Sequence, residues 1–361
     1  MNVRHLILLS TIGIFWGGAR EVPAADPYAG NDPYWVLLHE PAVVEELKLS
    51  DSQRKAYTEL LDRLDLRFFP LRNKPQDEAV AGMNAILAEV RDELQRMLSG
   101  AQRKRLNEIL LRHLGNAAIL RDDVTAQLRY TDEQRKQMRE ISQETRTALR
   151  ELRKESGKDG DQKSFEKKYL DLRTDEQMKM LALMKPEQKA DLKKMLGAPF
   201  SVTSLRKPAF KAPELVDTGE WINSSPLRLE QLHGKVVVLH FYASGCINCI
   251  HNYQWYREWH DRFRNKDVVL IGIHTPETAS ERDIAGVRRK AAEEKLAFPI
   301  LIDGQNENWN AWGNSMWPSV YLIDKRGYLR DFWAGELKWQ GNDGEKYMRE
   351  RIEGLLAEKN R

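Results

Sequence analysis

Residues 236–249 have the sequence VVVLHFYASGCINC, and this stretch decides the fold of the C-terminal part of the chain. Its first six residues are apolar and mostly β-branched, apart from His240, which is typical of a buried strand. A short turn follows, and Cys246 and Cys249 then open a helix that we expect to run to about Arg264. A C-x-x-C pair at a strand-to-helix junction indicates redox chemistry, because a helix N-terminus lowers the pKa of a thiol.

Strands and helices continue to alternate after this helix. We expect further strands at 268–273, 300–303, 320–324 and 328–334, and helices at 281–295 and 344–359. The order β-α-β-α-β-β-α, with C-x-x-C after the first strand, predicts a thioredoxin-like α/β domain with three layers, α/β/α.

Four stretches in this region resemble the TlpA/ResA-like branch of extracytoplasmic thioredoxins, and in particular the C-terminal thioredoxin domain of DipZ-type proteins. They are residues 226–241, 244–249, 271–277 and 317–324. The resemblance covers about 210–357 and joins several motifs in the correct order. It implies a thiol-disulfide oxidoreductase of the protein-disulfide reductase type, whose only redox group is the Cys246–Cys249 disulfide, with no other cofactor.

The two cysteines are expected to play different roles. Cys246, at the helix start, should be the exposed nucleophile that attacks protein disulfides. Cys249, one turn later, should resolve the mixed disulfide. The resemblance further implies that Pro318 follows a cis peptide bond and that the backbone of Trp317 pairs with the substrate chain. The alternative for Pro318 is an ordinary trans turn.

Two positions depart from the thioredoxin pattern. Gly245 stands where thioredoxins usually carry Trp, and His240 replaces their buried carboxylate. We expect His240 to be buried, either as a proton relay for Cys249 or as a histidine satisfied by a backbone carbonyl. Glu277 is another candidate acid or base, with helix capping or plain surface exposure as the alternatives.

The sequence also offers residues of the types that bind metals. Cys246, Cys249, His240 and His251 could surround zinc or copper. A cysteine pair beside a cis-proline already has an explanation, so we expect no metal. Residue 250 is Ile rather than His, which excludes the c-type haem attachment motif.

The part of the chain before about residue 200 has a different composition. No proline occurs between Pro75 and Pro186, and no tryptophan between Trp35 and Trp221. Apolar residues recur there at helical spacing, which predicts an all-α module. The expected divisions are a helical module at 25–200, a linker at 201–213 and the thioredoxin-like domain at 214–361.

A short motif recurs at four of the predicted helix starts. In each copy an apolar residue precedes a Ser or Thr that is followed three residues later by Gln; the copies begin at Leu49, Leu98, Tyr130 and Met184, with Lys185 replacing the hydroxyl in the last. Such a pair forms a capping box. The copies resemble the Leu-Thr-x-x-Gln motif of Spy/CpxP-like periplasmic helical proteins, some of which are chaperones or stress sensors. The alternative is that these capping boxes simply begin helices.

The N-terminus indicates export. Arg4 and His5 precede an apolar run at 6–16, and residues 22–24 (Val-Pro-Ala) offer a cleavage site, so residues 1–24 are expected to be a signal peptide. The alternative is an uncleaved anchor. We therefore expect a periplasmic or secreted protein, in a compartment where disulfides persist.

Composition narrows the function classes. With 57 Lys and Arg against 54 Asp and Glu, the 361-residue chain has a net charge of +3, which argues against nucleic-acid binding. With only two cysteines, a disulfide framework is excluded. No apolar run of about 18 residues follows the N-terminus, so no internal membrane span is expected. An electron donor would therefore be a separate membrane protein. Two hypotheses remain: an exported thiol-disulfide oxidoreductase, or a non-catalytic helical chaperone or envelope-stress sensor with a thioredoxin-like binding domain.

Overall fold

The computed structural model describes most of the chain as two compact units. The described residues are 32–159, 162–202, 205, 207–339 and 341–359, so the signal peptide predicted at 1–24 lies outside them. Within these ranges, unit 1 contains Asp32–Leu49 and Leu98–Arg206, and unit 2 contains Ser50–Met97 and Lys207–Arg361. No helix in the described ranges is both long and apolar enough to span a bilayer.

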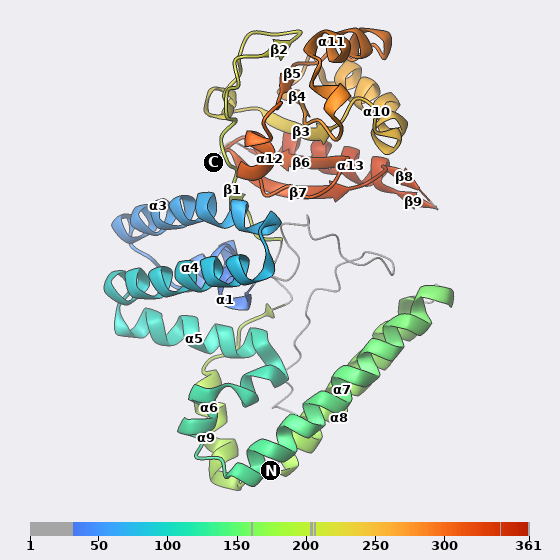
Figure 1. The fold of residues 1–361 in the computed structure, drawn as a ribbon. Helices are drawn as coiled ribbons and strands as arrows, with labels where there is room; N and C mark the ends of the chain where they lie inside the picture. Colours follow the sequence, from blue (N-terminus) through green and yellow to red (C-terminus); the bar gives the residue numbers. More distant parts are fainter. Residues whose placement is uncertain (1–31, 160–161, 203–204, 206, 340, 360–361) are drawn as a thin grey trace. The chain divides into compact units, whose positions relative to one another are not determined.

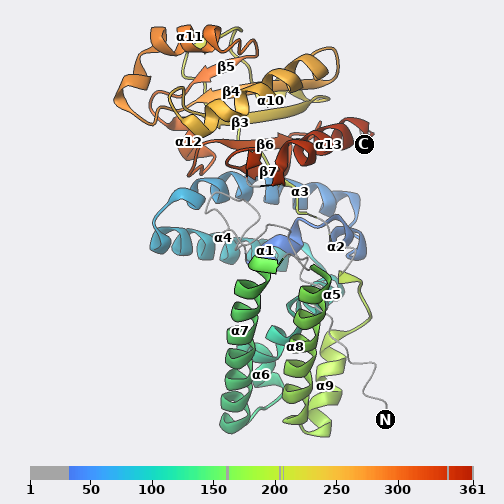
Figure 2. The ribbon, with the colours of Figure 1, turned by 90° about the vertical axis from the view of Figure 1, so that its right-hand side faces the viewer.

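Unit 1 is built from helices that pack through leucine, isoleucine and methionine side chains. Its described helices are α1 (Pro33–Leu38), α2 (Pro41–Glu46), α5 (Gly100–Leu114), η3 (Gly115–Leu120), α6 (Asp122–Gln127), α7 (Asp132–Asp159), α8 (Gln162–Ala182) and α9 (Pro186–Leu196). The long helices α7 and α8 lie side by side (Figure 2). The all-α character predicted from apolar spacing is confirmed for this unit.

The predicted capping boxes are present. The Ser99 hydroxyl accepts the N–H of Gln102 while the Gln102 side chain accepts the N–H of Ser99. Thr131 and Gln134 form the same reciprocal pair at the start of α7. In the last copy Pro186 occupies the first helical position, as the sequence indicated.

The glutamines of these boxes also join segments that are far apart in sequence. The side-chain amide of Gln134 donates to the carbonyl of Leu183 at 2.7 Å, and that of Gln188 donates to Leu128 at 3.1 Å. Gln134 of α7 therefore binds the turn that precedes α9, and Gln188 of α9 binds the turn that precedes α7. This cross-linking goes beyond the capping role that the sequence motif alone predicted.

Unit 2 is centred on a seven-stranded sheet in the described residues (Figure 1). The strand order is β1-β7-β6-β3-β4-β5-β2, in which β3, β4 and β5 are parallel and the other pairings are antiparallel. The strands are β1 (Phe210–Lys211), β2 (Trp221–Ile222), β3 (Val236–Tyr242), β4 (Val268–His274), β5 (Ile300–Ile302), β6 (Ser319–Ile323) and β7 (Tyr328–Ala334). A small hairpin of β8 (Lys338–Trp339) and β9 (Asn342–Asp343) is separate.

Every residue of β3 is buried, which shows that both faces of the sheet are covered at this strand. Val236 and Val238 share a core with residues of three helices: α10 (Ile247–Phe263), α11 (Ile284–Glu293) and α13 (Gly344–Ala357). On the opposite face, Phe241 contacts Trp309 of α12 (Glu307–Ala311) and the adjacent Trp312. The thioredoxin-like α/β architecture predicted from the sequence is confirmed. The helix expected at 281–295 is instead a 3-10 turn, η6 (Ala279–Arg282), followed by α11.

The N-terminal helices do not all belong to one unit. Three elements group with the C-terminal residues: α3 (Asp51–Phe68), η2 (Phe69–Asn73) and α4 (Gln76–Met97). The Asp65 carboxylate accepts the N–H of Lys211 at 2.7 Å, and the Tyr328 hydroxyl donates to Asp62 at 2.8 Å. The structure thus differs from the expected single helical module at 25–200, because these contacts join residues too distant in sequence for local periodicity to indicate.

Candidate active site

The two cysteines lie where β3 gives way to α10. Cys246 is the N-cap residue of α10 and is half-buried, whereas Cys249 lies in the first turn and is fully buried. The Cys249 N–H donates to the carbonyl of Cys246 at 3.0 Å, which closes this first turn. Both are free cysteines in the structure.

The surroundings shift the two thiol pKa values in opposite directions. The hydrogen bond from the Cys249 side chain, together with the backbone N–H groups of Cys249 and Asn248, lowers the pKa of Cys246 to about 7, although partial burial and the charge of Glu277 oppose this. Burial raises the pKa of Cys249 well above its ordinary value, and its hydrogen bond to Cys246 adds to the effect. At neutral pH the exposed sulfur is therefore the reactive thiolate.

A cis-proline immediately precedes β6. The Trp317–Pro318 peptide bond is cis, the isomer that the family resemblance implied, and not the alternative trans turn. Trp317 and Cys246 both pack against the hydrophobic cluster that contains Cys249. The Trp317 indole donates to the carbonyl of Thr275 at 3.1 Å and stacks on Trp309 with ring centroids 4.2 Å apart.

His240, on β3, lies in an aromatic environment. Its ring stacks on Tyr256 at a centroid distance of 4.0 Å, and Gly272 on the neighbouring strand leaves the room that the imidazole needs, since a Cβ there would lie 3.1 Å from Nε2. Neither ring nitrogen has a hydrogen-bond partner among the described residues, so the alternative with a backbone carbonyl partner is wrong. Burial lowers the pKa of His240 to about 3, which keeps the ring neutral.

Further polar groups adjoin His240 on the same face of the sheet. His274 and Tyr242 are directly opposite each other on β4 and β3, with ring centroids 5.3 Å apart. Both histidine nitrogens and the Tyr242 hydroxyl are buried without a partner in the described ranges. Burial lowers the pKa of His274 to about 4. The sequence analysis did not single out these two residues; only the alternation of Tyr242 with His240 along one predicted strand could have indicated them.

Glu281 holds the loop that leads into Cys246. Its carboxylate accepts the N–H groups of Gly245 at 2.6 Å, Thr278 at 2.8 Å and Glu277 at 2.9 Å. Burial alone would raise the pKa of Glu281, but these donors outweigh it and the pKa is lowered. The sequence analysis missed this residue; the capping box formed by Thr278 and Glu281 was the available signal.

Glu277 is exposed, and its N–H is one of the donors to Glu281. Its negative charge raises the pKa of both Cys246 and Cys249, which places the carboxylate within electrostatic reach of both sulfurs. Glu277 is thus a solvent-facing carboxylate next to the thiol pair, and the role of acid or base remains a prediction.

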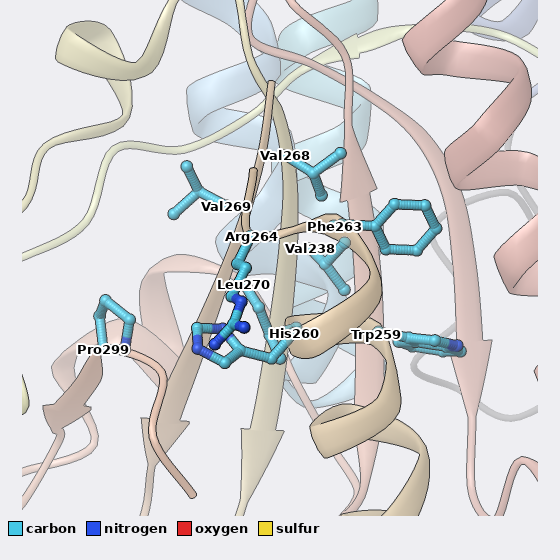
Figure 3. A pocket seen from close by; sticks show the side chains of 9 residues that line it. All are labelled: Val238, Trp259, His260, Phe263, Arg264, Val268, Val269, Leu270 and Pro299. Carbon is cyan, nitrogen blue, oxygen red and sulfur yellow. The ribbon is translucent and has the colours of Figure 1, made fainter. Parts of the chain in front are cut away.

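The described residues also bear on two other kinds of site, a metal centre and a pocket for a small molecule. Within the described residues, no group of three or more His, Cys, Asp or Glu side chains is arranged to hold a metal ion. A mostly apolar pocket lies at the C-terminal end of α10 (Figure 3), lined by Val238, Trp259, His260, Phe263, Arg264, Val268, Val269, Leu270 and Pro299. Since a helix rises about 1.5 Å per residue, this pocket is roughly 20 Å from Cys246 and does not form part of the thiol site.

Comparison with known proteins agrees with this geometry. Residues 206–332 match the family model described as the AhpC/TSA family. Over 128 residues the chain is 35% identical to protein DipZ of Mycobacterium bovis, covering 35% of this chain and 18% of DipZ. The C-terminal part of the chain therefore contains a thioredoxin-like domain that is similar to the AhpC/TSA family.

Two further relatives of this thioredoxin-like domain carry names that state an activity. The chain is 28% identical over 154 residues to thiol-disulfide oxidoreductase YkuV of Bacillus subtilis, covering 43% of this chain and 97% of YkuV. It is 28% identical over 110 residues to thiol-disulfide oxidoreductase ResA of Geobacillus thermodenitrificans, covering 30% of this chain and 60% of ResA. The chain spans about a fifth of the length of DipZ. The Spy/CpxP-like resemblance of the N-terminal helices stays a prediction.

Proposed function

We propose that this chain is an exported thiol-disulfide oxidoreductase that acts on protein disulfides and dithiols through Cys246 and Cys249. The observation that carries the proposal is the asymmetry of the two thiols, in a domain that also has the cis Pro318. Cys246 is half-exposed with a pKa of about 7, whereas Cys249 is buried with a raised pKa. This is the pairing that a nucleophile and a resolving thiol require.

The reaction starts when the Cys246 thiolate attacks one sulfur of a substrate disulfide. The new Cys246–substrate bond replaces the substrate disulfide bond, and the released substrate thiolate takes up a proton. Cys249 then loses its proton and attacks the Cys246 sulfur, which forms the Cys246–Cys249 disulfide and releases the second substrate thiolate. The substrate gains two electrons and the cysteine pair loses them, so no further cofactor is needed; a separate membrane donor would restore the dithiol.

The proton of Cys249 is handled by one of two groups in this proposal. His240 was the first candidate, but a base with a pKa of about 3 accepts a proton poorly from a thiol whose own pKa is raised. Glu277 is close enough to influence both thiols and faces solvent, where a proton can leave. Because basicity does not separate the two groups, both stay candidates: Glu277 as a solvent-facing acceptor and His240 as a buried relay.

Trapping tests the proposal. The full chain should reduce insulin in the presence of dithiothreitol. C249S should accumulate an adduct with insulin that reductant cleaves, because attack survives and resolution does not, whereas C246S should trap almost none. Trapping by C246S instead, or a wild-type chain with no effect on insulin reduction, would contradict the assignment and favour the non-catalytic alternative.

A further inference from the structure

The turn η2, which lies between α3 and α4, contacts the segment that leads into the cis-proline. The Arg72 guanidinium donates to the carbonyl of Trp312 at 3.0 Å. The Asn73 side-chain amide donates to the carbonyl of Asn314 at 3.1 Å and to the side chain of Asn310 at 3.3 Å. Two neighbouring residues of the N-terminal helical region thus bind three points within residues 310–314, all inside unit 2.

The fit between these segments is close. Gly313 has a φ of +54°, and a Cβ at this position would lie 1.9 Å from the carbonyl oxygen of Phe69. The Phe69 ring is buried and meets the Trp312 ring edge-on at 6.0 Å. Only glycine therefore allows this approach, and residues 310–314 cannot shift without breaking contacts to η2.

The held segment connects by two routes to Trp317, whose backbone is expected to pair with the substrate chain. Asn314, fully buried, donates through its side-chain amide to the carbonyl of Met316, which immediately precedes Trp317. Trp309, in the same helix as Asn310, stacks on the Trp317 ring. A displacement of residues 310–314 would therefore be passed to Trp317 through both the backbone and the ring stack.

We propose that Arg72 and Asn73 are positioning residues for substrate binding, so that the N-terminal helical hairpin fixes the loop on which a substrate polypeptide is aligned. The inference rests on the proposed oxidoreductase function and adds to it a role for helices outside the thioredoxin-like domain. In the described part of the chain neither cysteine forms a hydrogen bond with η2, so the effect should fall on binding of an extended polypeptide rather than on thiol chemistry.

The test compares a polypeptide substrate with a small disulfide. In the full chain, N73A should raise the KM for insulin roughly three- to tenfold, as expected for lost hydrogen bonds, and leave kcat within about twofold. The rate with 5,5′-dithiobis(2-nitrobenzoate), which has no peptide backbone to align, should be unchanged. N84A, at an exposed asparagine on α4, is the matched control and should behave as wild type.

The other outcomes are decisive as well. N73D keeps the side-chain volume but places a carboxylate against the Asn314 carbonyl, so it should raise the KM for insulin at least as much as N73A does. Thermal unfolding shows whether each variant is folded. A folded N73A and N73D with unchanged KM would overturn the inference, as would an equal loss with both substrates. A wild-type chain inactive towards both disulfides would instead refute the proposed function, and this inference with it.

Discussion

The residues around the two thiols form an outer layer and an inner layer, which differ in how their polar groups are hydrogen-bonded. In the outer layer, Glu281 ties down the loop before Cys246 through three backbone N–H groups. In the inner layer, His240 and His274 are buried with no hydrogen-bond partner among the described residues. The outer layer thus controls geometry by hydrogen bonds, while the inner layer controls protonation by excluding water. The difference shows that one site can fix the position of its nucleophile and the charge state of its interior by separate physical means.

The largest expected effect is on folding stability at acidic pH. The pKa of His240 is about 3 and that of His274 about 4 in the folded protein, against 6.5 for an ordinary histidine. Below pH 6.5 these two histidines bind protons in the unfolded chain but stay neutral in the folded chain. The free energy of unfolding therefore falls as the pH falls. Each histidine contributes about 1.4 kcal/mol per pH unit, which gives roughly 5 kcal/mol for the pair between pH 6.5 and 4.5.

Urea unfolding across this pH range measures the effect. H240F, which fits the aromatic surroundings, should remove about half of the slope of the free energy of unfolding against pH. A substitution at exposed His233 should leave this slope unchanged. If H240F retained the full slope, the inner layer would not act through burial of neutral histidine.

The second prediction compares the two cysteines directly. At pH 7 about half of Cys246 should be thiolate, against less than about 1% of Cys249, so iodoacetamide should alkylate Cys246 more than about 50-fold faster. The Cys246 rate should rise about tenfold per pH unit up to pH 7 and then level off. Peptide mapping by mass spectrometry measures both rates in the reduced chain. In urea the difference should vanish; equal rates in the folded chain would remove the distinction between the layers.

The third prediction concerns the hydrogen bonds of the outer layer. E281Q loses a charged acceptor for Gly245, Thr278 and Glu277, and should slow attack by Cys246 on insulin about tenfold, because bonds to charged groups contribute about 1.5–3 kcal/mol. The midpoint of the Cys246 alkylation profile should move upwards as the N–H donors to its sulfur lose alignment. E293Q, at an exposed carboxylate on α11, controls for the lost charge. A downward midpoint would show that Glu281 acts by its charge rather than by position.

The smallest expected effect belongs to Glu277. Since its charge raises the pKa of Cys246, E277Q should lower the alkylation midpoint by less than about one pH unit, and 1 M salt should reduce the difference from wild type. If Glu277 accepts the Cys249 proton, E277Q should also slow resolution of the mixed disulfide more than its formation. Stopped-flow kinetics with insulin separate the two steps, and unchanged resolution would exclude Glu277 as the acceptor.

The sequence predicted the two cysteines and the burial of His240, but it missed Glu281, Tyr242 and His274. Cys246 and Cys249 were predictable because their motif joins a strand end to a helix start, whereas the cis bond before Pro318 was implied by the family resemblance. The packing of Tyr242 against His274 depends on strand register, which no local pattern specifies. The capping boxes were predicted as helix starts, but their glutamines also bind carbonyls some 50 residues away, which only the tertiary structure determines.

The discontinuity of unit 2 has a consequence for the order in which the chain can fold during synthesis. Tyr328 donates to Asp62 across 266 residues. At about 5–20 residues per second, the hairpin of α3 and α4 emerges from the ribosome roughly 13–53 s before this partner exists. During that interval its apolar side, which carries Phe68 and Phe69, lacks the strands that later bury it. Unit 2 must therefore be completed from its two ends around an intervening unit, and factors that shield apolar helices during this delay should govern its yield.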